Sequence, residues 1–156
     1  MDLSEQYLEM CKQAKEIQDI WNIKEGDYIL HVEGDLKEIG ISVSHSKDSA
    51  NFYVNGRVKY TYSFSTLFWI PRQDQLQDLS WNTDILEDNI RHLLMRFNDT
   101  INGLEPEDQD FYWTQFSTFE QLWITFYMWT KHYKIWNGEH WIKKEEKEEK
   151  HESNSQ

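Results

Sequence analysis

The stretch WIPRQDQLQDL, Trp69 to Leu79, divides the sequence into two parts with different apolar patterns. Before it, from Asp27 to Phe64, apolar residues alternate with polar ones, which is typical of β-strands. After it they recur every three or four residues, which is typical of α-helices. We expect Trp69 and Ile70 to end a strand, and Pro71 to be the first residue of a helix, where no backbone donor is needed.

The strand region predicts a mostly antiparallel sheet of about four strands. Glu33-Gly34-Asp35 indicates a turn between the first two strands. Asn55-Gly56 is a strong hairpin signal, because both residues tolerate positive φ. The flanking segments NFYV (51–54) and RVKYTYSFSTLFWI (57–70) are rich in the aromatic and β-branched residues that strands prefer.

Helical periodicity is present at both ends of the chain. An apolar stripe from Leu3 to Trp21 predicts an N-terminal helix, started by a capping box of Asp2 and Glu5. Another stripe predicts a helix that opens at Asp84 and closes near Asn102-Gly103.

The last predicted helix is the most apolar. Ser117 and Glu120 form its capping box, and Asn137-Gly138 ends it. From Leu122 to Trp129 it is apolar nearly all round, which is typical of a helix packed on several sides. We expect the following residues to fold back over it, namely Trp136, Trp141 and Ile142.

These patterns predict one α+β domain over residues 1–142. It would contain an N-terminal helix, an antiparallel sheet of about four strands, and three C-terminal helices with a long aromatic last helix. The chain has 8 Trp, 8 Tyr and 8 Phe, which is enough aromatic surface for a core. Residues 143–156, KKEEKEEKHESNSQ, predict a charged, disordered tail.

The chain carries a formal net charge of -12, from 16 basic and 28 acidic residues. Such a charge repels phosphate backbones, so we expect no direct binding of nucleic acid. It is consistent with a protein that imitates nucleic acid and occupies a basic groove of a partner, or simply with a charged surface that keeps the protein in solution.

The location expected from the sequence is the cytoplasm. Cys11 is the only cysteine, so no internal disulfide and no cysteine metal cluster can form. The N-terminus lacks the basic and apolar regions of a signal peptide. The longest apolar run, near Leu122 to Trp129, is too short to span a bilayer, and we expect no membrane contact.

The sequence contains no motif that assigns a reaction. The six histidines lack metal-ligand spacing, and neither a glycine-rich phosphate loop nor a GxSxG elbow is present. We therefore predict no enzyme, no catalytic residue, no metal ligand and no cofactor. A hydrolase that holds Mg²⁺ or Mn²⁺ between dispersed carboxylates is kept as an alternative.

The most acidic part of the chain runs from Asp78 to Asp110. Its nine acidic residues against Arg91 and Arg96 leave a net charge of -7. This segment is our candidate for an acidic partner surface, although a solvated helix face followed by a loop is the simpler explanation. The candidate residues are Asp84, Glu87, Asp88, Glu105, Glu107, Asp108 and Asp110.

A second candidate site begins at the predicted strand-to-helix corner. Arg72 could pair with a carboxylate or phosphate through its guanidinium fork, and aromatic walls with a few polar groups are typical of ligand pockets. Helix capping and solvation are the simpler explanation of the polar residues after Pro71, since turns and caps use the same residue types. The predicted pocket lies between the sheet and the last helix, with the binding residues Trp69, Arg72, Gln73, Asp74, Gln121 and Trp123.

Five segments resemble, in order, a group of small uncharacterised proteins encoded in phages and prophages of Gram-positive bacteria. They are EIQDIW (16–21), GDYI (26–29), WIPRQDQLQDL (69–79), FEQLWITFYM (119–128) and KIWNGEHW (134–141). The resemblance covers most of the chain from about Leu3 to Trp141 and carries no catalytic residues. It implies an accessory protein that acts by binding.

Three functions are therefore expected from the sequence. The first is inhibition or modulation of a host protein, in host takeover or in countering host defence; the partner would be basic or nucleic-acid-binding. The second is binding or sequestering of a nucleotide-like small molecule. The third is the metal-dependent hydrolase. The oligomeric state is left open.

Overall fold

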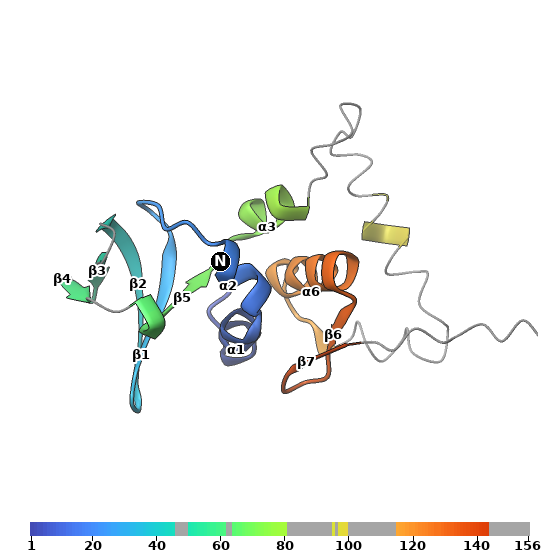
Figure 1. Cartoon of the computed structure of the whole chain (residues 1–156), viewed down its shortest axis with the longest axis horizontal. Helices are drawn as coiled ribbons and strands as arrows, with labels where there is room; N and C mark the ends of the chain where they lie inside the picture. Colours follow the sequence, from blue (N-terminus) through green and yellow to red (C-terminus); the bar gives the residue numbers. More distant parts are fainter. Residues whose placement is uncertain (46–49, 62–63, 81–94, 96, 100–114, 144–156) are drawn as a thin grey trace, which may run out of the picture.

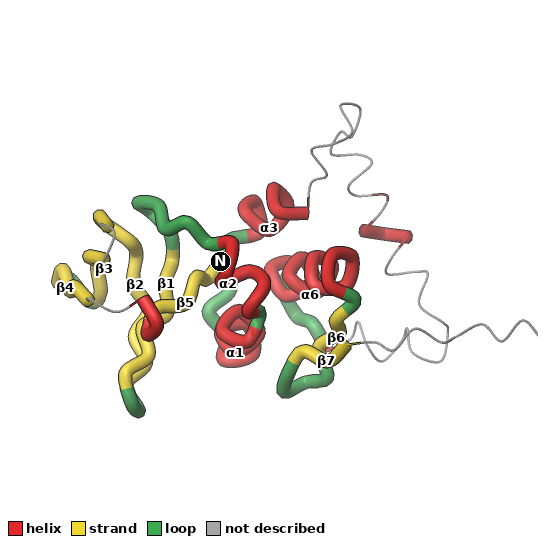
Figure 2. Tube along the Cα trace, viewed as in Figure 1, coloured by secondary structure: helices red, strands yellow, loops and turns green. Residues whose placement is uncertain are grey.

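The computed structural model describes residues 1–45, 50–61, 64–80, 95, 97–99 and 115–143. These residues form a curved antiparallel sheet with helices gathered beside one of its edges and a small hairpin below them (Figures 1 and 2). The α+β class predicted from the sequence is confirmed. The predicted charged tail, residues 143–156, lies outside the described residues apart from Lys143, which belongs to a short strand instead.

The main sheet has five strands in the order β4-β3-β2-β1-β5, one more than expected. The strands are β1 (Tyr28–Glu33), β2 (Leu36–His45), β3 (Ala50–Val54), β4 (Arg57–Thr61) and β5 (Leu67–Ile70). The two predicted turns are confirmed: Gly34-Asp35 joins β1 to β2, and Asn55-Gly56 joins β3 to β4 with φ of 49° and 80°. All the paired strands are antiparallel.

The additional strand comes from the segment 57–70, which holds two strands instead of one. A short 3₁₀ helix, η1 (Phe64–Thr66), precedes β5. β5 then crosses the sheet and pairs with β1, so that Trp69 lies opposite Ile29 and Ile70 lies opposite Tyr28. The prediction that Trp69 and Ile70 end a strand is confirmed.

The N-terminal helix is divided in two, and its predicted cap is wrong. α1 (Glu5–Gln13) and α2 (Lys15–Ile20) meet at Ala14. Ser4 is the N-cap of α1, because its hydroxyl accepts a 3.3 Å hydrogen bond from the backbone N–H of Tyr7. Asp2 instead accepts a hydrogen bond from the Ser4 N–H and is buried against the last helix.

The last helix, α6 (Phe119–His132), is confirmed, but both of its predicted ends are displaced. Its N-cap is Thr118 rather than Ser117, with a 3.2 Å hydrogen bond from the Gln121 N–H to the Thr118 hydroxyl. It ends at Tyr133, which has a left-handed φ of 55°. Asn137-Gly138 lies in the turn of a separate hairpin, made of β6 (Lys134–Trp136) and β7 (Trp141–Lys143).

The helix after β5 also begins later than predicted. α3 (Gln73–Ser80) starts two residues beyond Pro71, and Arg72 is the residue whose carbonyl accepts the first helical hydrogen bond, from Leu76. The Gln75 side chain accepts a 2.9 Å hydrogen bond from the Arg72 N–H, which satisfies an otherwise free donor at this end. The predicted helix from Asp84 lies mostly outside the described residues.

Two buried clusters hold the elements together. The larger one joins α1, α2, α3 and α6 to one face of the sheet, and it includes Tyr7, Ile70 and Trp123. The smaller one lies on strands β1, β3 and β5 and includes Ile29 and Phe52. The sheet is therefore packed on both faces near β1, since Leu30 belongs to the first cluster and Ile29 to the second.

α6 has an almost continuous run of buried residues from Gln121 to Met128, as the apolar pattern predicted. Among the described residues, no helix combines the length and the apolarity needed to cross a membrane.

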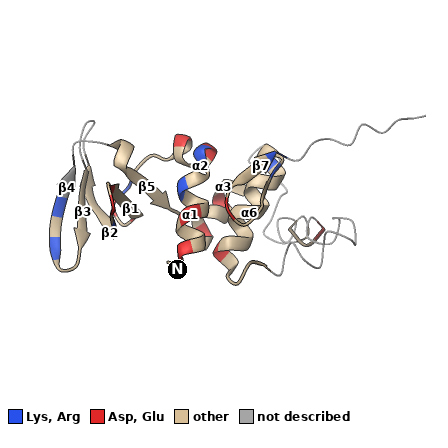
Figure 3. Cartoon of the chain, turned by 90° about the horizontal axis from the view of Figure 1, so that it is seen from below, with Lys and Arg blue, Asp and Glu red and all other residues tan. Residues whose placement is uncertain are grey.

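Charges are unevenly placed: Figure 3 shows basic residues on β4, at the edge of the sheet, and acidic residues on α1 and α3.

Candidate functional site

The loop between α2 and β1, residues 21–27, is organised by one buried carboxylate. Asp27 is only 3% exposed, and it accepts hydrogen bonds from the Trp21 indole N–H (3.0 Å), the Lys24 backbone N–H (2.8 Å) and the Gln75 amide (2.8 Å). Three donors thus compensate the burial of its charge. They also tie the loop to α3 and hold the Trp21 ring in one orientation.

The backbone of the same loop is joined to the sheet. The Gly26 N–H donates to the Ser42 carbonyl (2.9 Å), and the Ser42 N–H donates to the Asp27 carbonyl (2.8 Å). Gly26 has a φ of +87°, which favours glycine over other residues. The loop is therefore fixed at both its side chains and its backbone.

Trp21 lies parallel to Trp69 of β5, with an angle of 4° between the rings and 6.3 Å between their centroids. Two hollows open beside this pair, and Trp21 and Asn22 line both of them. We call the two hollows together the Trp21 groove. Because its central ring is held by Asp27, the groove exists before any ligand binds.

The larger hollow has a volume of about 720 Å³. Its aromatic walls are Trp21, Phe64 and Phe68, and its polar edge includes Asn22 and His45. This volume lies within the range of about 300–1,000 Å³ that is common for small-molecule pockets.

The smaller hollow, of about 200 Å³, lies between the end of α2 and α3, and we call it the α2–α3 slot. Ile20, Trp21, Trp69 and Leu79 give it apolar walls. Its polar residues are Asn22, Lys24, Asp27, Gln75 and Asp78. Asn22, Lys24 and Asp78 are exposed, and within the described part of the chain their side chains make no hydrogen bond or ion pair.

The binding residues predicted from the sequence do not gather around either of these two hollows. Of its residues, only Trp69 lines either of the two hollows. Arg72 pairs with Asp74, with N to O distances of 3.2 and 3.3 Å, and Gln73 is half-buried in the first turn of α3. The Arg72 guanidinium also reaches the Gly26 carbonyl (3.4 Å), which explains its position without a ligand.

Gln121 and Trp123 belong to the interior. The Gln121 amide donates to Asp2 (2.8 Å) and to the Ser4 hydroxyl (3.1 Å), and its oxygen accepts from the Ser117 N–H (3.0 Å). Trp123 is 2% exposed and stacks on Phe97, with 4.6 Å between ring centroids. Both residues are buried, and neither lines the two hollows.

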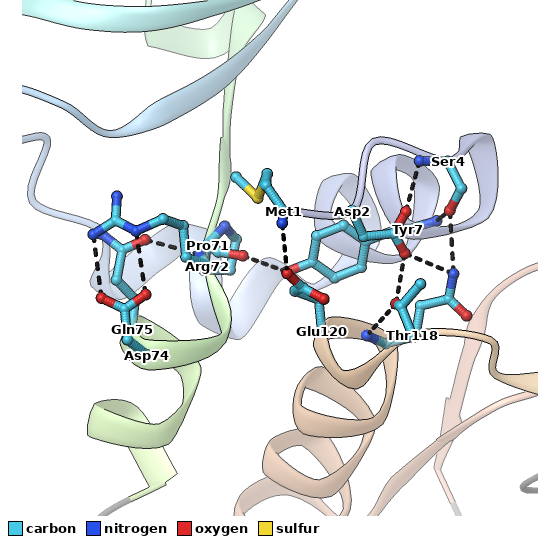
Figure 4. Close-up of polar contacts among 11 residues, drawn as sticks. Met1, Asp2, Ser4, Tyr7, Pro71, Arg72, Asp74, Gln75, Thr118 and Glu120 are labelled. Atoms are coloured by element: carbon cyan, nitrogen blue, oxygen red, sulfur yellow. Dashed lines mark hydrogen bonds and ion pairs between the residues drawn. The ribbon is translucent and has the colours of Figure 1, made fainter.

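Asp2 is the centre of a polar cluster between the start of the chain and the start of α6, shown in Figure 4. Its carboxylate accepts from the Ser4 N–H (2.8 Å), the Thr118 hydroxyl (2.7 Å) and Gln121. Burial alone would raise the pKa of Asp2, but these hydrogen bonds outweigh it and lower the pKa below its usual value. Beside it, the Tyr7 hydroxyl donates to the Pro71 carbonyl, which joins α1 to the end of β5.

The predicted acidic partner surface lies outside the described residues and stays a prediction; its residues are Asp84, Glu87, Asp88, Glu105, Glu107, Asp108 and Asp110. Among the described residues, no group of three or more His, Cys, Asp and Glu is arranged to hold a metal ion. The part of the chain that the structure describes thus offers the Trp21 groove as its candidate site.

Sequence reasoning missed the residues that form this groove. The apolar stripe from Leu3 to Trp21 places Trp21 on the first predicted helix and indicates no site there. An available signal was the concentration of Trp21, Asn22 and Asp27 in the short segment before the first strand, since a buried carboxylate needs donors nearby. Comparison with protein families, characterised proteins and solved structures found no match.

Proposed function

We propose that this chain is an accessory protein of a phage or prophage of a Gram-positive bacterium, and that it binds a host protein and modulates its activity. The observation that carries the proposal is the Trp21 groove, in which two hollows share one aromatic ring held by a buried carboxylate. Its apolar walls and free polar edge are the combination found at the centre of protein interfaces.

Rigidity supports a binding role for the groove. A partner that meets a preformed surface loses less conformational entropy on binding than one that must order it. The three donors on Asp27 keep Trp21 in place, and the backbone bonds between Gly26, Asp27 and Ser42 keep the loop on the sheet. Tryptophan is also among the residues that contribute most to binding energy at interfaces.

Charge supports a basic partner. A net charge of -12 accelerates the encounter with a positively charged protein, and this acceleration weakens as salt screens the charges. A host protein that binds nucleic acid has such a basic surface. The protein would then compete with nucleic acid for that surface.

The test is affinity capture from a host lysate at low and high salt, with the wild-type protein and two variants. Asn22→Arg places a long side chain in the part shared by both hollows, and Asn22 is exposed and makes no side-chain bond within the described residues. Ser117→Arg is the matched control, because Ser117 is exposed, lines neither hollow and lies outside the acidic segment 78–110.

We expect a basic host protein that is retained by wild type and by Ser117→Arg, lost with Asn22→Arg, and released at high salt. The circular dichroism spectra and urea midpoints of the three proteins should agree, so that loss of binding is not loss of folding. Equal capture by Asn22→Arg and wild type would remove the groove from the proposal. Capture that does not depend on the salt concentration would contradict the proposal that the partner is basic.

A second function, binding of a nucleotide-like small molecule, is supported by one separate observation. The larger hollow has about 720 Å³ and aromatic walls on which a planar ring can stack. Native mass spectrometry of protein purified from the host tests this alternative. A bound small molecule that is present in wild type and absent in Asn22→Arg supports it, and protein of the bare chain mass counts against it.

A further inference from the structure

We infer that the α2–α3 slot receives one apolar side chain of the partner, from a segment in which that side chain is flanked by lysine or arginine. The inference rests on the proposed function and specifies the partner's chemistry at the same site. It follows from the size of the slot, from the composition of its walls, and from the free charges at its rim.

The size and the walls select an apolar side chain. The slot has a volume of about 200 Å³, which accommodates a side chain of the size of leucine or methionine with some of its backbone. Ile20 lines the slot and is 51% exposed although it is large and apolar, and Leu79 lines the slot as well. An apolar side chain between them would remove this surface from water, which is the main source of binding energy at such contacts.

A second observation indicates that the slot is incomplete without an occupant. Trp69 is 7% exposed and lines the slot, and its indole N–H has no hydrogen-bond partner in the described part of the chain. A buried donor without an acceptor costs free energy. A backbone carbonyl of the bound segment, beside its apolar side chain, would supply the acceptor after a small movement of the ring.

The charges select basic neighbours. The slot is lined by Asp27, Asp78 and Lys24, which leaves one net negative charge. The Asp27 carboxylate already accepts three hydrogen bonds, so the exposed Asp78 carboxylate, which has no partner among the described residues, is the anion available to a bound segment. A cation that follows the apolar side chain would pair with Asp78, and the net charge of -12 attracts it.

The probes for the test are three capped tripeptides: acetyl-Lys-Leu-Lys-amide, acetyl-Lys-Ala-Lys-amide and acetyl-Glu-Leu-Glu-amide. Binding is followed by the shifts of the Trp21 and Trp69 indole N–H signals in ¹H–¹⁵N spectra at low salt. We expect Lys-Leu-Lys to move both signals, and to bind about tenfold more tightly than the alanine peptide, because the leucine side chain buries more apolar surface. The glutamate peptide should bind more weakly than Lys-Leu-Lys.

The variant Asp78→Lys separates the charge effect from general attraction. It changes one exposed residue of the slot, and it should reverse the order of the Lys-Leu-Lys and Glu-Leu-Glu peptides. Asp35→Lys, in the exposed turn between β1 and β2, makes the same charge change elsewhere and should leave the order unchanged.

Three results would overturn the inference: equal binding of the leucine and alanine peptides, no shift of either indole signal, or an unchanged peptide order in Asp78→Lys. The two proposals fail separately. If a host protein is captured through the groove but no tripeptide binds in the slot, only the inference about the α2–α3 slot is wrong. If the peptides bind as expected but no host protein is captured, the proposed function is wrong.

Discussion

The side chain of Gln18 is hydrogen-bonded to both backbone polar groups of Trp69. Its oxygen accepts from the Trp69 N–H (2.8 Å), and its amide nitrogen donates to the Trp69 carbonyl (3.1 Å). The nitrogen also donates to the Cys11 carbonyl (2.8 Å). β5 is the edge strand of the main sheet, so Gln18 takes the place that a further strand would occupy. It joins α1, α2 and β5 next to the Trp21 groove.

Gln18→Ala should therefore destabilise the protein by about 1–3 kcal/mol, because it leaves partly buried backbone groups without partners. Gln18→Glu should fall between alanine and wild type, since a carboxylate accepts from the Trp69 N–H but cannot donate to its carbonyl. Urea unfolding followed by far-UV circular dichroism measures both. The control is Gln77→Ala in α3, whose side chain makes no hydrogen bond in the described structure and should change stability little.

Asp27→Asn should destabilise the protein and widen the range of orientations of Trp21. The amide keeps only one acceptor oxygen for the three donors from Trp21, Lys24 and Gln75, and a hydrogen bond to a charged group contributes about 1.5–3 kcal/mol. Urea unfolding measures the loss of stability, and the Trp21 indole N–H signal in ¹H–¹⁵N spectra reports the range of ring orientations. Glu25→Gln removes a charge from an exposed neighbour, and an equal loss in that control would contradict the role given to Asp27.

Asp2 should make the stability depend on pH in the acidic range. Its folded-state pKa is lowered, so its contribution is present above the unfolded value, about 3.9, and is lost as pH falls through the lower folded value. Asp2→Asn should be less stable than wild type at pH 7, and this difference should shrink between about pH 5 and pH 2. Urea unfolding over that range checks it, with Asp35→Asn as the exposed control. A difference that stays constant over that range would contradict the prediction.

Gly40→Ala tests the packing inside the sheet. A Cβ at Gly40 would lie 2.7 Å from Val54 Cγ2 and 3.0 Å from both the Phe52 ring and the Tyr53 carbonyl oxygen. The crowding should cost about 1–3 kcal/mol. In the double variant Gly40→Ala/Val54→Ala, the loss should be smaller than the sum of the two single losses, because the closest contact is removed. Simple additivity of the three unfolding free energies would contradict it.

Cys11 should be unreactive in the folded protein. It is fully buried, and burial raises the pKa of its thiol, which leaves little of the reactive thiolate. A thiol reagent such as DTNB should therefore react quickly only after unfolding in urea. Ser117→Cys places a second thiol at an exposed position and should react quickly in the native protein, which shows that the reagent works under those conditions.

Local patterns predicted those elements whose residues are neighbours in the sequence. The β3–β4 hairpin follows from Asn55-Gly56, whose positive φ values suit few other pairs, and α6 follows from the nearly continuous apolar surface of its middle. Helix caps were less well predicted. Ser4 and Thr118 compete with Asp2 and Ser117, which have equally suitable side chains, and contacts between distant segments decide between them.

The candidate site could not be predicted in the same way. We predicted that Arg72 and Gln121 face one cavity. In the structure, the Arg72 guanidinium is hydrogen-bonded to Asp74 and to the Gly26 carbonyl. The Gln121 amide is hydrogen-bonded to Asp2 and Ser4. The partners of a polar side chain depend on which distant segments pack beside it. A sequence pattern does not contain that information.

The sequence by itself determined the α+β class, the antiparallel hairpins and the buried last helix, because each depends on periodicity or turn chemistry within a short stretch of chain. Only the tertiary structure decided that β5 pairs with β1, that Gln18 covers the edge of β5, and that Trp21 lies against Trp69. The Trp21 groove exists because these contacts, which join residues about fifty positions apart, place α2 and α3 on either side of one ring pair.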